Sequence, residues 1–157
     1  MVAAALGLGA LAACAPAQPG PTPIPIPGTA DHPREVNIIA REYTYDPSTV
    51  DLVPGETVLF HIVNAGLDVH EVVIGDTTTQ DAWEAAEAAV AGAPPGPTPV
   101  VSVPPDRSGL RVVVTSGQRV DAVWTVPASR TPALIVGCHI PGHWAKGMHV
   151  PVRFIAP

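Results

Sequence analysis

Prolines and glycines divide this chain into short segments, and this division restricts the folds open to it. The 157 residues include 20 prolines and 14 glycines, together about 22% of the chain, against about 12% in an average protein. A proline removes a backbone N–H and breaks or bends a helix, so this content argues against a helical bundle. The runs between these residues are rich in Val, Ile and Thr, which is typical of strands separated by turns.

These β-rich runs recur about every ten residues, a spacing that predicts a β-sandwich. One alanine-rich stretch, Asp81–Val90, breaks the pattern. It opens with an Asp-x-x-Glu capping pattern and stops at Gly92, so we expect a single short helix inserted between strands. The proline-rich segment 93–109 is expected to be irregular. The predicted strands are Val36–Ile39, Thr49–Val53, Thr57–Val63, Val69–Ile74, Arg111–Thr115, Val120–Val126, Ala133–Val136 and Val150–Ile155.

The charge balance and the cysteine count exclude several classes of protein. The net charge is −6, and Lys146 is the single lysine of the chain. Binding to nucleic acid requires many basic side chains, so a nucleic-acid partner is excluded. Two cysteines are too few for a scaffold built on several disulfides or for a zinc site with several thiolates.

The first 33 residues have the composition of an export signal followed by a tether. Residues 2–13 are apolar, and no charged residue precedes Asp31. The apolar run is shorter than the roughly 20 residues that span a bilayer and fits the core of a secretory signal. It ends in Leu-Ala-Ala-Cys, which resembles a bacterial lipobox.

We therefore expect a signal peptide at 1–13, a lipidated Cys14 with a proline-rich tether at 14–33, and a functional domain at 34–157. The alternative is a plain cleaved signal with an incidental cysteine. Either reading predicts an exported protein. The expected location of the protein is the outer face of the cytoplasmic membrane, where a lipid would anchor it, or the periplasm.

One short stretch near the C-terminus concentrates potential metal ligands. Residues 138–149 contain Cys138, three histidines and Met148, although the chain has only six histidines and one other methionine, Met1. Thiolate and thioether are soft ligands that favour copper, and a blue-copper site combines two imidazoles and a thiolate with a weak axial methionine. Cys138, His143 and Met148 supply three of these ligands. The second histidine must come from elsewhere, and His70 is the candidate.

At this point the chain resembles the cupredoxin (type 1 copper) family over about residues 36–157. The resemblance rests on Asn64-x-Gly66-x-x-x-His70 and on Cys138-x4-His143-x4-Met148, whose spacings are most similar to those of rusticyanin-like and sulfocyanin-like members. It implies an all-β, Greek-key β-sandwich with one mononuclear copper ion. It also implies a carrier of single electrons between redox protein partners rather than an enzyme.

Other copper sites fit the motif less well. A multicopper oxidase needs His-x-His pairs, and a binuclear copper-A centre needs a second nearby cysteine; this sequence has neither. His139 follows the thiolate on a strand and should point to the opposite side. Two functional alternatives stay open, a copper-trafficking or copper-resistance protein and a ligand-free interaction domain. In a ligand-free interaction domain, Cys138 would be a buried thiol and Met148 would only fill the core.

Residues around the ligands have expected roles of their own. Asn64 is either a simple turn residue or a side chain that braces the ligand loop. The neighbours of His143 are uncharged, so Pro141, Trp144 and Ala145 are expected to form an apolar docking patch for a redox partner. The alternative is that Trp144 folds inward and the patch only caps the sandwich.

Overall fold

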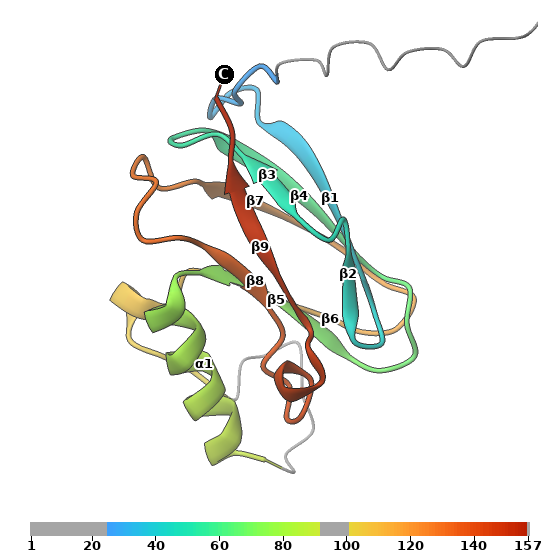
Figure 1. The fold of residues 1–157 in the computed structure, drawn as a ribbon. Helices are drawn as coiled ribbons and strands as arrows, with labels where there is room; N and C mark the ends of the chain where they lie inside the picture. Colours follow the sequence, from blue (N-terminus) through green and yellow to red (C-terminus); the bar gives the residue numbers. More distant parts are fainter. Residues whose placement is uncertain (1–24, 92–100, 157) are drawn as a thin grey trace, which may run out of the picture.

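Two β-sheets lie face to face in the computed structural model, which describes residues 25–91 and 101–156 (Figure 1). The four-stranded sheet has the order β2 (Thr44–Asp46), β1 (Arg34–Arg41), β4 (Thr57–Asn64), β7 (Arg119–Thr125). The five-stranded sheet has the order β3 (Val50–Leu52), β9 (His149–Phe154), β8 (Ile135–Gly137), β5 (His70–Gly75), β6 (Leu110–Val114). One α-helix, α1 (Thr77–Ala89), and two short 3₁₀ turns, η1 (Pro105–Arg107) and η2 (Trp144–Lys146), complete the elements.

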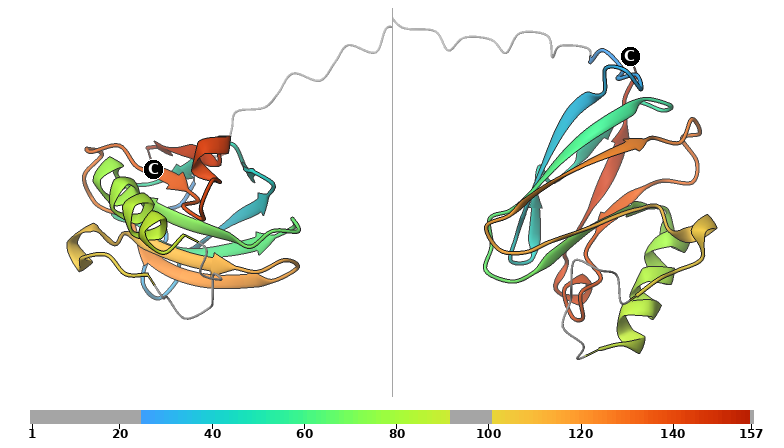
Figure 2. Two further views of the ribbon diagram at one scale, coloured as in Figure 1. Left: turned by 90° about the horizontal axis from the view of Figure 1, so that it is seen from below. Right: turned by 180° about the vertical axis from the view of Figure 1, so that it is seen from behind.

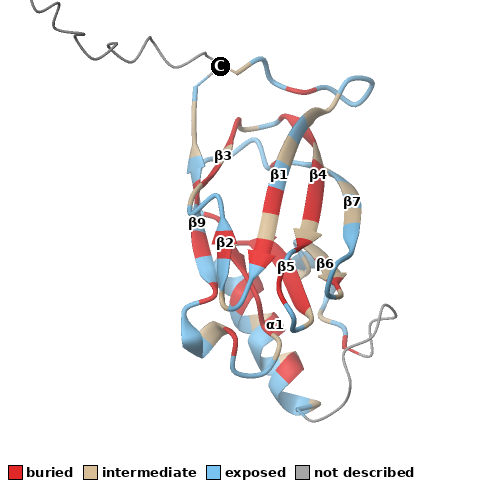
Figure 3. Cartoon of the chain, turned by 90° about the vertical axis from the view of Figure 1, so that its right-hand side faces the viewer, coloured by how far each residue is buried: buried red, intermediate tan, exposed pale blue. Residues whose placement is uncertain are grey.

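The core lies between the two sheets and follows the alternation of side chains along the strands. Ile38, Phe60 and Ile62 of the first sheet are fully buried, as are Val72 and Ile74 of the second. Side chains two residues apart point to the same face of a strand, so each sheet presents an apolar row to the other. Figure 3 shows these buried segments in red along the middle of β1 and β4.

Helix α1 covers the outer face of the second sheet, beside β5 and β8 (Figure 1). Every residue of β5 is buried, because its inner face meets the core and its outer face meets the helix. Val73 on the outer face packs with Trp83 of α1 in a second, smaller apolar cluster. A strand buried on both faces needs no alternation of polar and apolar residues, which is why Val72, Val73 and Ile74 follow one another in β5.

The predicted β-sandwich and all eight predicted strands are confirmed, with boundaries shifted by a few residues. The predicted helix start at Asp81 is wrong. The helix begins at Thr77, because the side chain of Asp76 accepts a hydrogen bond from the Thr79 N–H at 2.9 Å and so caps the start of the helix. Its last residue is Ala89, before the expected stop at Gly92. The three-residue strand β2 was not predicted, since it is too short to show an alternating pattern.

The two ends of the sandwich carry different parts of the chain. Both ends of the described chain lie at one end, and the segment 138–148 lies at the other (Figures 1 and 2). Part of the expected tether contacts the sandwich. The Gly28 carbonyl accepts from the Thr57 N–H at 2.9 Å, and the Gly28 N–H donates to the buried Glu56 carboxylate at 3.3 Å. The expected signal peptide and Cys14 lie outside the described residues. No helix within residues 25–91 and 101–156 has the length and apolar composition needed to cross a membrane.

Candidate metal centre

Two neighbouring strands and one loop carry the potential metal ligands. His70 is the first residue of β5, and Cys138 directly follows β8, its antiparallel neighbour. The loop from Cys138 then folds back on itself. The Cys138 N–H donates to the Met148 carbonyl at 3.1 Å, and the Met148 N–H donates to the His143 carbonyl at 3.1 Å. These bonds bring residues 138, 143 and 148 together beneath one end of the sandwich.

Three of the four predicted ligands form a tight cluster. The potential ligand atoms of His70, Cys138 and His143 all lie within 4.8 Å of one another, and all three residues are buried. The Cys138 Sγ atom is 3.3 Å from His143 Nδ1, and the two imidazole centroids are 5.2 Å apart. Met148 is fully buried in the same core cluster as Cys138. The structure therefore brings together side chains that are far apart in the sequence.

The unpartnered atoms of His70 indicate that a metal is part of this site. Within the described residues, both ring nitrogens of His70 are buried without a hydrogen-bond partner. Leaving a buried polar atom unpaired costs about 1–3 kcal/mol, so such atoms are rare in folded proteins. A metal bond to one nitrogen removes part of this cost. Two imidazoles and one thiol beside a buried thioether are the donor set of a type 1 copper ion, and this set fits that ion.

The protonation states of the cluster favour metal binding by the histidines. Burial lowers the pKa of His70 and that of His143, so both imidazoles are neutral and able to act as ligands at neutral pH. Burial raises the pKa of the Cys138 thiol to about 12, although the backbone N–H groups of Glu71 and Ile140 oppose this rise. Metal binding must therefore displace a proton from Cys138.

Asn64 binds three backbone groups next to His70, two in the turn between β4 and β5 and one in β6. Its Nδ2 donates to the Asp68 carbonyl at 2.7 Å and to the Val114 carbonyl at 3.0 Å, and its Oδ1 accepts from the Gly66 N–H at 2.8 Å. The side chain is fully buried. It therefore fixes the turn between β4 and β5 that delivers His70, which goes beyond the role of an ordinary turn residue.

The Glu42 carboxylate is a neighbour of His70 that the sequence analysis did not predict. Its Oε1 lies 3.8 Å from His70 Nε2 and accepts from the backbone N–H of Leu67 and, at 3.0 Å, from that of Asp68. These backbone hydrogen bonds lower the pKa of Glu42 to about 2, and the bond from Asp68 has the largest effect. A negative charge on the Nε2 side favours a proton on Nε2, so Nδ1 is the nitrogen that would be free to bind a metal. Glu42 is 28 residues before His70, and no sequence pattern links the two.

His143 is the potential ligand nearest the surface. It is 7% exposed, whereas His70 and Cys138 are fully buried. Around it Pro141 and Ala145 are exposed, and Trp144 is half-buried. Tyr43 meets the His143 ring edge-on at 4.9 Å, and the Lys146 ammonium lies 3.7 Å from the Tyr43 ring centroid.

His139 and Trp144 lie on the side of the loop that faces α1. The His139 ring nitrogens are 2.8 Å from Glu84 and 2.6 Å from Gln80, so the ring points away from the cluster. Trp144 stacks on His139 at 4.8 Å and on His149 at 4.6 Å. Trp144 is therefore partly covered by its neighbours rather than fully exposed or folded into the core.

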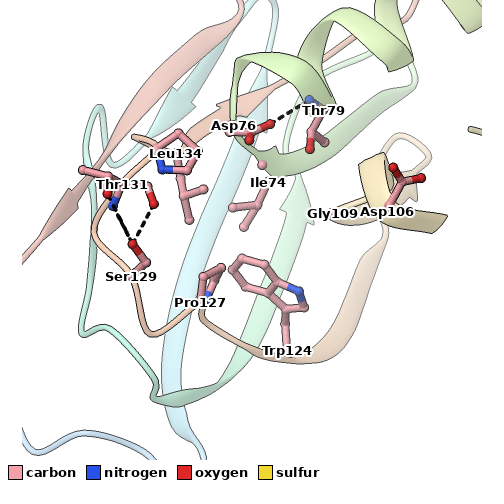
Figure 4. A pocket seen from close by; sticks show the side chains of 12 residues that line it. Ile74, Asp76, Thr79, Asp106, Gly109, Trp124, Pro127, Ser129, Thr131 and Leu134 are labelled. Carbon is pink, nitrogen blue, oxygen red and sulfur yellow. Dashed lines mark hydrogen bonds between the residues drawn. The ribbon is translucent and has the colours of Figure 1, made fainter. Parts of the chain in front are cut away.

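A small pocket of about 170 Å³ lies at a different place, beside the start of α1 (Figure 4). Trp124, Pro127 and Leu134 supply its apolar wall, and Asp76 and Asp106 lie at its border. The Asp76 carboxylate is already engaged in capping Thr79. No residue of the His70, Cys138 and His143 cluster lines this pocket, so it is not part of the metal centre.

Comparison with solved structures identifies the fold. Auracyanin from Roseiflexus castenholzii superposes with a TM-score of 0.62 and 20% identity, over 82% of this chain and 100% of that chain. Auracyanin A from Chloroflexus aurantiacus superposes with a TM-score of 0.61 and 19% identity, over 78% of this chain and 99% of that chain. An azurin from Methylomonas sp. strain J superposes with a TM-score of 0.57 and 15% identity, over 78% of this chain and 98% of that chain. No protein-family model and no curated protein matches the sequence.

These likenesses define the class of protein at the level of the fold, which is that of the cupredoxins. The resemblance expected from the sequence is confirmed at this level, and the His-Cys-His cluster is the arrangement that a type 1 copper site requires. The similarity of the ligand spacings to rusticyanin-like and sulfocyanin-like members stays a prediction.

Proposed function

We propose that this protein is a blue-copper carrier that passes single electrons between redox partners. The observation that carries the proposal is the buried cluster of His70, Cys138 and His143, in which both nitrogens of His70 lack a partner within the described residues. Bound copper would supply a one-electron couple, Cu(I) and Cu(II), and no substrate would be chemically transformed. The protein is therefore a carrier rather than an enzyme.

Each ligand has a distinct role in this proposal. Cys138 would supply the thiolate, His70 and His143 would supply the two imidazoles, and Met148 would supply the weak thioether donor. Two hydrogen bonds within the loop already hold Met148 against Cys138 and His143. A frame fixed by strands and by buried backbone bonds resists change between oxidation states, which is what rapid electron transfer requires.

The alternative function, copper trafficking or copper resistance, uses the same ligands for delivery of the ion. Reversible voltammetry and copper transfer to a chelator distinguish the two. An electron carrier gives one reversible wave and keeps its copper when a Cu(I) chelator is added. Rapid, complete loss of copper to the chelator without a reversible wave would favour trafficking.

The surface around His143 is our candidate for the docking site of the redox partners. Pro141, Trp144 and Ala145 are neighbours of the ligand nearest the surface, and Leu67, in the turn before His70, is 88% exposed. Exposed apolar side chains of this kind are typical of interaction sites, and transient redox complexes bury less than about 1,200 Å².

We further propose that the protein is exported and anchored by a lipid on Cys14. The apolar run before Cys14 and the proline-rich segment after it support this proposal. The domain would then lie on the outer face of the cytoplasmic membrane or in the periplasm, where its partners must also be found.

A further inference from the structure

A buried polar network lies on the outer face of the second sheet, behind the ligand cluster of His70, Cys138 and His143. The proposed function does not require this network. The network joins helix α1 to the residues that directly follow His70 and Cys138, namely Glu71 and His139. Successive side chains of a strand point to opposite faces. The two ligands therefore face the core, while Glu71 and His139 face the helix, and both are almost completely buried.

We propose that α1 is a positioning element of the copper site, which fixes the two ligand-bearing segments from behind. The copper-dependent part of this inference rests on the proposed function. The positioning of the backbone does not, because it is a property of the metal-free chain. The network has two branches that meet at one hydrogen bond.

The first branch runs from the helix to Glu71 through Arg111 of β6. Arg111 Nε donates to Glu71 Oε2 at 2.8 Å, and Arg111 Nη2 donates to Glu87 Oε1 of α1 at 2.6 Å. The guanidinium also lies 4.5 Å from the ring centroid of Trp83. Glu71 and Glu87 are buried, and removing one member of a buried charged network leaves the others uncompensated. The helix therefore controls where the Glu71 carboxylate lies.

The second branch runs from the helix to His139. The His139 ring lies between Glu84 Oε2 at 2.8 Å and Gln80 Oε1 at 2.6 Å. The Gln80 amide nitrogen in turn donates to backbone carbonyls of the second sheet, the closest being that of Ile135 at 2.9 Å. Two α1 side chains thus hold the residue that follows Cys138, and one of them is itself fixed to the strand that leads to Cys138.

The branches meet where the His139 N–H donates to Glu71 Oε1 at 2.9 Å. This bond links the peptide that follows Cys138 to the side chain that follows His70, so it fixes the distance between the two ligand segments. Two buried carboxylates, those of Glu71 and Glu87, face the single guanidinium of Arg111 in this network. A buried negative charge beside the cluster stabilises Cu(II) relative to Cu(I). The network therefore acts on both the geometry and the potential of the site.

A purely structural helix makes a different prediction. If α1 only covered the apolar face of β5, breaking the network would lower the stability of the whole domain. It would leave the backbone behind Cys138 as protected as the rest of the core. The test must therefore compare local and global effects in the same variant.

The test uses Glu87→Gln in the full chain, with Asp81→Asn as the matched control. Asp81 is an exposed carboxylate on the same helix, and no hydrogen bond involves its side chain in the described structure. The first readout is amide hydrogen exchange of the metal-free protein, for His139 and for Ile62 in the central strand β4. Ile62 reports global unfolding.

In Glu87→Gln the His139 amide should exchange about tenfold faster relative to Ile62, as expected for loss of one charge-assisted hydrogen bond. In Asp81→Asn the ratio should not change. The second readout is the reduction potential of the copper-bound protein. It should rise in Glu87→Gln by an amount that shifts the Cu(I)/Cu(II) ratio about tenfold, or about 59 mV for one electron.

Glu84→Gln is the second variant, because Glu84 is exposed on the helix and its loss does not endanger folding. It removes the negative charge from the contact to His139 alone and should also accelerate exchange of the His139 amide. The proposal is overturned if both variants behave like Asp81→Asn. Failure to bind copper would contradict the proposed function instead, while the exchange ratio in the metal-free protein would still decide the role of α1.

Discussion

At the scale of single residues, Cys138 carries the chemistry of the site. Its thiol is fully buried with a pKa of about 12, so the metal-free protein holds a proton there at every physiological pH. Binding of a metal to the thiolate releases this proton. Copper uptake should therefore strengthen as the pH rises, which distinguishes a thiolate ligand from a bystander cysteine.

Met148 is the residue whose role is tested most simply. Met148→Leu preserves the size of the side chain but removes the thioether, a donor that stabilises Cu(II) more than Cu(I). We expect the blue colour to stay and the reduction potential to rise, by about 59 mV if the relative stabilisation changes tenfold. Voltammetry of the two proteins measures this. An unchanged potential would mean that Met148 only fills the core.

Part of the site could be predicted from residues alone. Cys138, His143 and Met148 lie within eleven residues, and soft donors crowded in this way are visible in the sequence. His70 lies far from them in the sequence, so it could be named only as the candidate for the second histidine, which the resemblance to a known motif then supported. Glu42 and Glu71 could not be predicted, because their importance depends on contacts across strands that no local pattern encodes.

At the scale of elements, strands were predicted more reliably than the helix boundary. The β-branched runs between turn residues located β1, β4 and β7 correctly. The start of α1 was misplaced because Asp81 and Asp76 both resemble N-caps, and only the structure shows that Asp76 caps Thr79. The same helix proved to matter for the site, which its alanine-rich composition did not indicate.

The end of the sandwich opposite the ligands is closed by a buried ion pair, and this makes a prediction about acid stability. Glu56 is 2% exposed and pairs with Arg34 at 2.5 Å, and it also accepts from the Val53 N–H at 2.8 Å. Burial raises the pKa of Glu56, but Arg34 and the backbone donors outweigh it, so the pKa lies below its ordinary value of 4.5. The carboxylate form therefore stabilises the fold above pH 4.5, and this contribution is lost as the pH falls through the lowered pKa.

Glu56→Gln should therefore lower the free energy of unfolding by about 2 kcal/mol at neutral pH. The difference from the wild type should shrink at about pH 3. Urea unfolding at both pH values measures it, with the exposed Glu35→Gln as the control. If the difference were the same at both pH values, the charge of Glu56 would not be the stabilising feature.

The loop that contains η2 makes a prediction about docking. Ala145→Glu places a charge on the exposed surface beside His143 and should slow electron exchange with the physiological partner roughly tenfold. The absorption spectrum should be unchanged. Ala128→Glu is the matched control, since Ala128 is exposed in the loop between β7 and β8, towards the other end of the sandwich. Equal rates for both variants and the wild type would show that electrons use another surface.

In the whole molecule, the start of the described chain and the ligand cluster lie at opposite ends of the sandwich. Strand β4 runs from Thr57, bonded to Gly28, to Asn64 beside the ligand cluster. At about 3.3 Å per residue this strand separates the two ends by about 23 Å. A chain that enters at one end therefore leaves the surface around His143 free at the other.

This separation predicts that anchoring and metal binding are independent. Cys14→Ser should release the protein from the membrane fraction without changing its copper spectrum, because a lipid on Cys14 is the proposed anchor and the copper site lies in the folded domain. Cell fractionation and absorption of the released protein measure the two effects. A Cys14→Ser protein that stayed with the membranes would contradict the lipid anchor.

The central claim is that Cys138 binds copper as a thiolate in a type 1 site, and one spectrum tests it directly. The purified protein with one equivalent of Cu(II) should show an intense absorption band at about 600 nm, which arises from charge transfer between the thiolate and copper. Cys138→Ser should lose this band, because an alcohol is a poorly acidic, hard donor. A wild-type protein that binds copper without the band, or a Cys138→Ser variant that keeps it, would contradict the account.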